Sequence, residues 1–310
     1  MNPVSRRTFL AGASMAAATA LVSKNTLAAV RPVGLQLYSV RRELPNDYVG
    51  TLQKVAAIGY RDVEAAGFYN HSAPDVKKIM SDVGLRCISA HNSLTDLLKT
   101  PDATVEYGHT LGLKYLICAA PTVADTSRFA QYPGGSWEFI QHGMTADDWK
   151  WNAEQFNKFG EKARAAGIQF GYHNHTPEFR DVGNGLNGYQ ILQKETEPSL
   201  VTFELDCGWA TVAGQDAAKL IGEYGKRITM LHLKDFGPAP AGQPTDKRAS
   251  TEIGYGIVDF KPLLSAANAA EIAHAFIEQE EFDKPTFEAL KIDYNNINTL
   301  DSGGSVSKTA

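Results

Sequence analysis

Cysteine is scarce in this chain of 310 residues, which contains only Cys87, Cys118 and Cys207. Their spacing fits no zinc motif, and an odd number of cysteines excludes a fully paired disulfide framework. Each cysteine lies in or beside an apolar run, so we expect three buried free thiols. Basic charge is scarce too, because 35 Asp and Glu residues outnumber 30 Lys and Arg residues. A net charge of −5 without a basic stripe argues against a nucleic-acid partner.

The apolar segment near the start of the chain is too short to span a membrane. Arg6 and Arg7 precede an Ala-rich stretch that runs from Phe9 to Val22. A charged segment, a short apolar run and small residues are typical of a removable export signal, and the paired arginines resemble the twin-arginine type. We therefore predict a signal over residues 1–28, a periplasmic location and no stable membrane association after signal removal. A general secretory signal is the alternative.

The rest of the chain alternates strand and helix patterns eight times. The predicted strands cover residues 33–40, 60–66, 85–91, 113–120, 168–173, 200–206, 228–234 and 273–279. The predicted helices cover residues 47–58, 73–83, 105–111, 146–166, 189–194, 216–224 and 260–269. Two long loops rich in Pro and Gly remain, 121–145 and 236–254, and the first is typical of an active-site loop.

Alternating strands and helices predict a parallel sheet that is covered by helices. Eight such units in about 280 residues fit a closed barrel. An open doubly wound sheet is the alternative, but the Gly-x-Gly-x-x-Gly fingerprint of dinucleotide-binding sheets does not follow the first strand. We therefore predict an α/β fold with a single (β/α)8 TIM barrel over residues 29–301, followed by a flexible tail of small and polar residues over 302–310.

Polar and ionisable residues lie at or near the carboxyl ends of almost all the predicted strands. In a parallel barrel these ends open on one face, so their side chains share a site. The residues are Gln36, Glu64, His91, His173, Asn174, His175, Glu178, Glu204, Asp206, His232, Lys234, Asp235, Glu278 and Glu280. Several converging carboxylates repel one another unless a cation neutralises them. Because histidine and carboxylate ligands suit Mn, Zn, Co or Mg, we expect one divalent metal ion.

Some of these residues also have structural interpretations. Glu204 shares the inward face of its strand with Asp206, but a buried ion pair is an equal alternative to a functional role. His91 alone is compatible with a core histidine that is satisfied by its neighbours. Asp235 and Glu280 are expected to support the site or to lie on the surface rather than to act in it.

At these positions the sequence resembles the xylose isomerase-like barrel superfamily, also called the sugar phosphate isomerase/epimerase family. The matching segments keep their order along nearly the whole mature chain. They are GLQLYSVR (34–41), GYRDVEAAGF (59–68), ISAHNS (88–93), GYHNHTPEF (171–179), ELDCGW (204–209), HLKD (232–235), IGYGIVDF (253–260) and FIEQEEF (276–282). Each segment alone is weakly specific, but together they are specific to the superfamily and not to one reaction.

The resemblance implies one divalent metal that is held by four residues at strand ends, usually Glu, Asp, His and Glu. Asp206, His232 and Glu278 match the last three of these ligands. The sequence departs from the pattern at the first ligand, where a histidine occupies the position of the expected Glu. The first ligand therefore stays open among His173, His175 and Glu178.

The chemistry that the resemblance implies is removal of a proton next to a carbonyl group. In this family the metal binds the carbonyl and a neighbouring hydroxyl oxygen and stabilises the enediolate that forms. A base then moves or removes the proton, which gives isomerisation, epimerisation or β-elimination. We expect His175 or Glu178 to be the base, and Glu64 and Lys234 to bind hydroxyl groups of the substrate.

The expected partner is a small carbohydrate, with Gln36 and His91 among the residues that bind it. Trp209 and Phe68 are candidate stacking surfaces for a sugar ring, although plain core or rim aromatics are an equal alternative. Phosphorylated sugars are mostly cytoplasmic, and no Gly-rich phosphate cradle is apparent in the sequence. An exported enzyme therefore predicts a non-phosphorylated sugar or keto-sugar as substrate.

The main functional hypothesis is a divalent-metal-dependent isomerase or epimerase. The first alternative is a metal-dependent lyase that acts on 3-keto-glycosides by β-elimination, because exported relatives with a His-Asn-His strand five resemble enzymes of oxidised sugars. A periplasmic sugar-binding protein without catalysis is a more distant alternative, since that class needs two lobes and a hinge. A metal-dependent DNA-repair nuclease of the same superfamily is opposed by the acidic charge. Neither the sugar nor the oligomeric state follows from the sequence.

Overall fold

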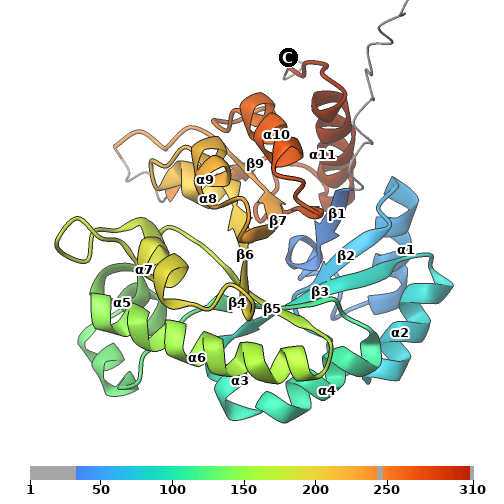
Figure 1. Cartoon of the computed structure of the whole chain (residues 1–310). Coiled ribbons are helices and arrows are strands. Elements are labelled where there is room, and N and C mark those ends of the chain that lie inside the picture. Colours follow the sequence, from blue (N-terminus) through green and yellow to red (C-terminus); the bar gives the residue numbers. More distant parts are fainter. Residues whose placement is uncertain (1–32, 243–246, 308–310) are drawn as a thin grey trace, which may run out of the picture.

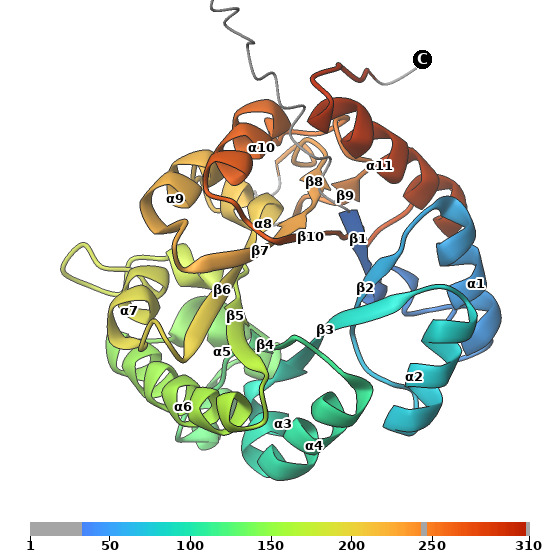
Figure 2. The ribbon, with the colours of Figure 1, turned by 45° about the vertical axis from the view of Figure 1, so that its right-hand side comes forward.

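The computed structural model describes residues 33–242 and 247–307, and within them eight parallel strands close into a barrel. Around the barrel the strands follow the order β1-β10-β7-β6-β5-β4-β3-β2. They are β1 (Val33–Gln36), β2 (Asp62–Ala65), β3 (Arg86–Ser93), β4 (Tyr115–Ala120), β5 (Gln169–His173), β6 (Val201–Asp206), β7 (Ile228–Leu233) and β10 (His274–Ile277). Figure 2 shows this ring of strands surrounded by helices. The predicted single (β/α)8 barrel is confirmed, and the open doubly wound sheet is wrong.

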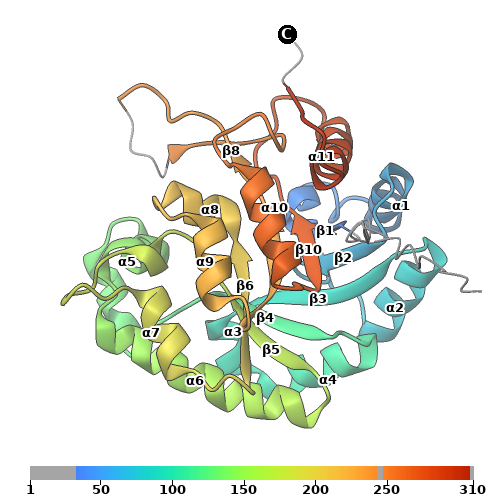
Figure 3. The same ribbon diagram turned by 45° about the horizontal axis from the view of Figure 1, so that its top comes forward.

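Helices form the outer layer of the barrel (Figure 1). They are α1 (Tyr48–Ile58), α2 (Ala73–Asp82), α3 (Leu94–Lys99), α4 (Pro101–Leu111), α5 (Gly135–Gly143), α6 (Ala146–Ala165), α7 (Gly188–Glu195), α8 (Cys207–Val212), α9 (Ala217–Tyr224), α10 (Phe260–Ala269) and α11 (Thr286–Asp301). Helices α9 and α10 are neighbours in space (Figures 1 and 3), as are α6 and α7. Among the described residues, no helix combines the length and apolar character that crossing a membrane requires. The predicted signal over residues 1–28 lies outside the described residues.

The longest helix, α6, begins at a strong local signal. The Thr145 side chain accepts the backbone N–H of Asp148, and the Asp148 carboxylate accepts the backbone N–H of Thr145. This reciprocal capping box satisfies two N–H groups that would otherwise lack a partner. Trp149 and Phe156 lie two turns apart on the same face and are fully buried. Gly188 lets α7 approach Trp149 closely, because a Cβ at Gly188 would lie 2.4 Å from the indole ring.

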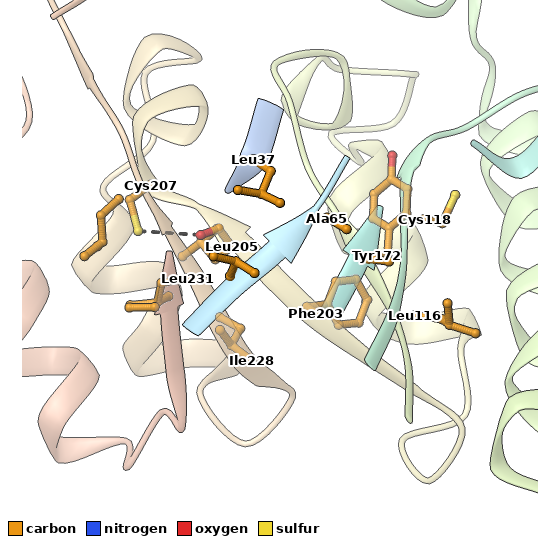
Figure 4. Packing of buried hydrophobic residues seen from close by; sticks show 14 of the residues in the cluster. Leu37, Ala65, Leu116, Cys118, Tyr172, Phe203, Leu205, Cys207, Ile228 and Leu231 are labelled. Atoms are coloured by element: carbon orange, nitrogen blue, oxygen red, sulfur yellow. Dashed lines mark hydrogen bonds between the residues drawn. The ribbon is translucent and has the colours of Figure 1, made fainter. Parts of the chain in front are cut away.

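Apolar side chains fill the space between the strands and the helices, and Figure 4 shows part of this core. Tyr172 on β5 and Phe203 on β6 are fully buried in it. Cys118 and Cys207 are buried as well, Cys87 is half-buried, and all three are free thiols. Burial raises the pKa of the Cys87 thiol to about 12. The predicted free thiols are confirmed, with Cys87 less buried than expected.

A second apolar cluster fills the inside of the barrel and consists of Ile88, Ile117, Met230 and Phe276. Since residues two apart on a strand share a face, Met230 lies one layer below His232 on β7. The ring centres of Phe276 and His232 lie 6.4 Å apart. Gly34 on β1 makes room for Phe276, because a Cβ at Gly34 would lie 2.5 Å from the Phe276 ring. An apolar floor therefore supports the polar residues at the strand ends.

The first predicted strand, residues 33–40, is shorter in the structure. It ends at Gln36, whose side-chain oxygen accepts the backbone N–H of Tyr38 at 3.0 Å. A polar side chain that bonds to the backbone two residues later offers an alternative to the strand ladder. The chain therefore leaves the barrel early and continues as a 3-10 helix, η1 (Leu37–Val40).

Both predicted loops contain regular structure. Residues 121–145 include the 3-10 helix η2 (Thr126–Gln131) and α5. Residues 236–254 contribute to an antiparallel pair formed by β8 (Asp235–Phe236) and β9 (Ser250–Thr251). Helices α3, α8 and α11 are further additions to the predicted elements.

Candidate metal centre and catalytic cavity

A cavity of about 800 Å³ opens at the carboxyl ends of the barrel strands. The predicted site residues that line it are His91, His173, His175, Trp209 and Glu278. The other residues that line it are Tyr38, Ala66, Gly67, Asn92, Ser93, Asp96, Ala119, Ala120, Trp137, Gln141, Thr176, Lys247 and Glu280. The structure thus brings the polar ends of several strands together around one space.

Three predicted metal ligands converge at the base of this cavity. Asp206 ends β6, His232 lies on β7, and Glu278 directly follows β10. The Nδ1 atom of His232 is 3.0 Å from Glu278 Oε2 and 3.8 Å from Asp206 Oδ2. One donor atom from each residue lies within 4.8 Å of the other two, so the three residues could hold a metal ion together.

The contacts of the Asp206 carboxylate indicate whether a cation would fit at this place. Its Oδ1 accepts the backbone N–H of Trp209 at 2.7 Å, but its Oδ2 is buried and has no hydrogen-bond partner among the described residues. Burying a carboxylate oxygen without a partner is costly. Burial raises the pKa of Asp206 to about 6, although the nearby Lys234 ammonium acts to lower it. A cation beside Oδ2 would satisfy this oxygen, so the residues present fit a metal ion.

His173, at the end of β5, extends the same group of donors. Its Nε2 lies 4.0 Å from Asp206 Oδ2, while its Nδ1 lies 3.0 Å from Glu204 Oε2. Among the three residues that the sequence left open as first ligand, His173 is the one with an ion-pair contact to Asp206 in the described chain. The geometry therefore favours His173 as the fourth ligand.

Glu204, which the sequence left between a functional and a structural role, lies at the centre of the histidine cluster. Its Oε2 is 2.7 Å from His91 Nε2, 3.0 Å from His173 Nδ1 and 3.2 Å from His232 Nε2. A carboxylate that holds one nitrogen of an imidazole fixes which nitrogen faces a metal. Glu204 therefore directs the other nitrogen of the His173 and His232 imidazoles toward Asp206.

A second carboxylate, Glu64 on β2, supports the same histidines. Its Oε1 is 2.7 Å from His232 Nε2 and 2.9 Å from His91 Nε2, and it accepts a side-chain N–H of Gln36 at 2.7 Å. Burial opposes ionisation, but the two imidazoles outweigh it and lower the pKa of Glu64. Burial also opposes the charge on His91, but Glu64 and Glu204 outweigh it and raise the His91 pKa to about 9. Carboxylates and imidazoles thus compensate one another's charge.

A deeper group of residues could also hold a metal ion and consists of His91, His173, Glu204 and His232. It shares His173 and His232 with the donors around Asp206. An imidazole whose one nitrogen is held by a carboxylate has its other nitrogen left for a metal. Since Glu64 and Glu204 hold the deeper nitrogens, the donors around Asp206 form the better metal site.

Three residues that were predicted to bind substrate do not line the cavity. Gln36 and Glu64 are 0% exposed and bind each other and the histidines, while Lys234 is 1% exposed. The Lys234 ammonium lies 2.8 Å from Glu278 Oε2 and also donates to Glu280. The polar groups of these three side chains are paired within the described residues, and their predicted contacts with substrate stay a prediction.

His175 lies on the cavity wall, two residues beyond the end of β5. Its ring is 5.2 Å from the ring of Trp137 and 6.0 Å from that of Trp209. Its Nδ1 is buried and has no hydrogen-bond partner within the part of the chain described. Burial, followed by the Lys234 ammonium, lowers the pKa of His175 to about 3, so its imidazole is neutral near pH 7. A neutral imidazole at this place can accept a proton from a bound molecule.

Glu178, the other predicted base, does not line the cavity. It lies in the 3-10 helix η3 (Pro177–Phe179) and is 1% exposed. Its carboxylate accepts the Tyr172 hydroxyl and, at 2.9 Å, the backbone N–H of His175. Burial raises the pKa of Glu178 to about 7. Glu178 therefore holds the turn that carries His175, and its role as base stays a prediction.

The aromatic residues of the site differ in part from the prediction. Trp209 lines the cavity as predicted. Phe68 instead lines a separate cavity of about 260 Å³ and packs against Tyr107, with ring centres 4.3 Å apart. Trp137 on α5 lines the central cavity, although the sequence did not single it out. Its position in the predicted active-site loop, residues 121–145, was the available indication.

Two further polar residues organise the strand ends. The side chain of Asn174 accepts the backbone N–H of Asp206 at 3.1 Å and donates to its backbone carbonyl at 3.3 Å, which ties β5 to β6. Asp235 is buried, and its carboxylate accepts four backbone N–H groups, from Phe236, Gly254, Gly256 and Val258. Asp235 therefore supports the loop after β9, in line with the supporting role expected for it.

Comparisons with known proteins agree with this arrangement. A family model described as xylose isomerase-like TIM barrel matches residues 52–294. An inosose dehydratase from Geobacillus thermodenitrificans is 24% identical over 257 residues, which cover 75% of this chain and 81% of that protein. A sugar phosphate isomerase/epimerase structure from Parabacteroides distasonis has a TM-score of 0.69 and 27% identity over 86% of this chain and 96% of its own. A second sugar phosphate isomerase/epimerase structure from the same organism has a TM-score of 0.68 and 25% identity, and the match covers 89% of this chain and 98% of that one.

The proteins in these comparisons are enzymes, named as a dehydratase and as isomerases or epimerases. The expectation that this chain is an enzyme of the isomerase, epimerase or lyase kind is thereby confirmed. The alternative of a sugar-binding protein without catalysis loses its support. Because the names differ in reaction type, they leave the reaction of this chain open.

Proposed function

The chain belongs to the xylose isomerase-like TIM barrel family, and we propose that it is a divalent-metal-dependent isomerase or epimerase of a non-phosphorylated sugar or keto-sugar. The observation that carries this proposal is Asp206 Oδ2, which takes part in no hydrogen bond among the described residues and faces His232 and Glu278 at the base of the cavity, with the Lys234 ammonium 3.5 Å away. The reaction would start with removal of the proton beside a carbonyl group and pass through an enediolate.

The proposed metal ligands are two imidazole nitrogens and two carboxylate oxygens, and they belong to His173, Asp206, His232 and Glu278. This mixed set suits Zn, Mn or Co more than Mg, which prefers oxygen ligands. When bound, the ion supplies Lewis-acid stabilisation of the oxyanion that develops on the substrate. Glu204 and Glu64 keep the ligand imidazoles oriented by holding their other nitrogens.

His175 is the group best placed to take the proton. It lines the cavity, is neutral near pH 7, and has an Nδ1 without a partner among the described residues. As the proton leaves the substrate, the negative charge that develops there stabilises the imidazolium. Trp137 and Trp209 flank this imidazole and offer apolar surface to a sugar ring.

The lining of the cavity supports an uncharged substrate. Among the described residues that line it, Lys247 is the only Lys or Arg. A phosphate group is bound tightly by several cationic or backbone N–H donors together. Export directed by residues 1–28, which we retain as part of the proposal, would place the enzyme in the periplasm and away from phosphorylated sugars.

β-Elimination is the second candidate, and the similarity to an inosose dehydratase favours it. Loss of water or of an alcohol from the carbon next to the enediolate needs the same first step, removal of a proton beside a carbonyl. A lyase would therefore use His175 and the metal ligands in the same way. With a 3-keto-glycoside as substrate, the group that leaves would be the aglycone.

Proton exchange in deuterated water tests both candidates. Protein loaded with Zn, Mn or Co is mixed with free sugars, keto-sugars or 3-keto-glycosides, and NMR follows the C–H signal beside the carbonyl. We expect exchange with at least one keto substrate. Delivery of a deuteron to the neighbouring carbon indicates isomerisation, delivery to the opposite face of the same carbon indicates epimerisation, and an unsaturated product indicates elimination.

Two variants separate the roles of the metal and the base. Asp206→Ala should lose both the metal and the exchange, whereas His175→Gln should keep the metal and lose exchange by about 10²–10⁴-fold. Lys284→Met, which breaks an ion pair with Glu252 away from the cavity, is the matched control. Undiminished exchange in Asp206→Ala would rule out a metal-dependent reaction at this site.

A further inference from the structure

We propose that Lys234 is an internal counter-cation that holds the ligand carboxylates when no metal is bound and competes with the metal for them. The inference rests on the metal centre proposed above. It goes beyond that proposal because Lys234, which is not a proposed ligand, would set the affinity of the site for metal.

The ammonium group of Lys234 lies among three carboxylates. Its Nζ is 2.8 Å from Glu278 Oε2 and 3.5 Å from Asp206 Oδ2, and it donates to Glu280 Oε1. The side chain is 1% exposed, and the ring centre of Trp209 lies 5.1 Å from Nζ. Because water is largely excluded, the charge of Lys234 acts on these oxygens with little screening.

The ammonium and a divalent ion would use the same two oxygens. Glu278 Oε2 and Asp206 Oδ2 are the atoms that face the ligand imidazole of His232. Without any cation these carboxylates would repel each other in a buried position. Lys234 supplies one positive charge there, so the barrel mouth is stable without metal. A divalent ion that binds the same oxygens must displace or repel that charge.

Glu280 provides the ammonium with a partner outside the ligand set. Its Oε1 binds Lys234, and its side chain lines the cavity rather than facing the ligand imidazoles. When a metal takes the two ligand carboxylates, Lys234 therefore keeps one partly buried ion pair. The affinity for metal then depends on how strongly Glu280 holds the ammonium.

Contact of Lys234 with a substrate hydroxyl group is the competing explanation. An ammonium group has three N–H donors, and Lys234 has three carboxylates around it. The residue is also absent from the described lining of the cavity. Without metal, the structure thus leaves Lys234 no free donor for a substrate hydroxyl group, which favours the counter-cation.

Metal titrations of two variants test the inference, because the expected effects have opposite signs. Lys234→Met keeps the length of the side chain without its charge, so stripped protein should bind Zn²⁺ and Mn²⁺ roughly tenfold or more tightly than wild type. Glu280→Gln leaves the ammonium with the ligand carboxylates alone, so it should bind these ions more weakly. General damage to packing would weaken both variants alike. Lys284→Met, at an ion pair with Glu252 2.9 Å long, is the control and should not change affinity.

Thermal unfolding gives a second readout. Without metal, Lys234→Met should have a lower Tm than wild type, and added metal should raise its Tm by more. Weaker or unchanged metal binding by folded Lys234→Met, or tighter binding by Glu280→Gln, would overturn the inference. If Lys234→Met does not fold without metal, the metal affinity of Glu280→Gln still tests the inference. Wild-type protein that binds no divalent ion would instead refute the proposed metal centre itself.

Discussion

Glu204→Gln should weaken metal binding, although Glu204 is not a proposed ligand. The substitution keeps the shape of the side chain and removes its charge. One oxygen of Glu204 lies 2.7 to 3.2 Å from nitrogens of His91, His173 and His232. An amide offers one acceptor oxygen and one N–H₂ donor in place of two acceptor oxygens. All three contacts are made by Oε2, so Gln can place its amide oxygen there but holds the imidazoles without a negative charge, and the nitrogen that faces the metal is fixed less firmly.

The structure sets the size of this effect. A hydrogen bond to a charged group contributes about 1.5–3 kcal/mol to stability, and each 1.4 kcal/mol corresponds to about tenfold in affinity. Groups that orient metal-bound histidines typically change affinity about 10–100-fold when they are replaced. We therefore expect Glu204→Gln to bind Zn²⁺ and Mn²⁺ about 10- to 100-fold more weakly than wild type.

Competition with a coloured chelator measures this affinity on protein stripped of metal at constant pH. Glu252→Gln, which changes a carboxylate that is paired with Lys284 away from the cavity, is the matched control. Unchanged affinity in Glu204→Gln would refute the reasoning. Complete loss of binding would refute it as well, because it would make Glu204 a ligand and move the metal to the deeper group.

Glu178→Gln should flatten the pH dependence of stability. Burial raises the folded-state pKa of Glu178 from the ordinary value of 4.5 to about 7. The stabilising contribution of Glu178 is therefore complete below pH 4.5 and is lost as the pH rises through 7. In urea unfolding, the wild type should lose up to about 3 kcal/mol of stability over this range, and the variant should not. Trp137→Ala should raise KM about two- to tenfold, since the indole lines the cavity. A smaller fall in kcat should accompany it, because the ring centre lies 5.2 Å from that of His175. A fall in kcat with constant KM in steady-state assays would contradict this. Gly34→Ala should lower the free energy of unfolding by about 1–3 kcal/mol, because its Cβ would lie 2.5 Å from the Phe276 ring and 2.8 Å from the Asp62 carbonyl oxygen. An unchanged denaturation midpoint would show that the apolar cluster inside the barrel can adjust to the added methyl group.

The barrel could be predicted because each strand and helix carries its own local pattern. The helix predicted over residues 146–166 agrees with α6 to within one residue, since its capping box and apolar face are both visible in the sequence. The end of β1 could not be predicted, because it depends on how the Gln36 side chain bonds to the backbone. Helix α5 lies in a segment with several glycines and little periodicity, which the sequence pattern indicates as a loop.

The convergence of the proposed metal ligands could be predicted because strand ends of a parallel barrel meet on one face. Alternation along a strand tells which side chains point inward, but not how deep they lie along the barrel axis. Glu64 and Lys234 were therefore expected to contact substrate, whereas the structure places them against histidines and carboxylates.

The role of Glu204 depends on contacts with residues of three other strands. No spacing within one strand contains this information, so only its inward direction could be predicted. His173 stands at the position where the family usually has a glutamate ligand, and the contacts of Glu204 fit this difference. A metal-binding histidine usually donates its other ring N–H to a carboxylate, a backbone carbonyl or water, and Glu204 lies 3.0 Å from His173 Nδ1.

Anomalous X-ray scattering from crystals of the protein soaked with Zn²⁺ or Mn²⁺ tests the central claim most directly. We predict one strong peak, about 2.0–2.2 Å from ligand atoms of four residues, His173, Asp206, His232 and Glu278. A peak centred on Glu204 and His91, or no peak at the base of the cavity, would contradict the proposed metal centre and the reaction built on it.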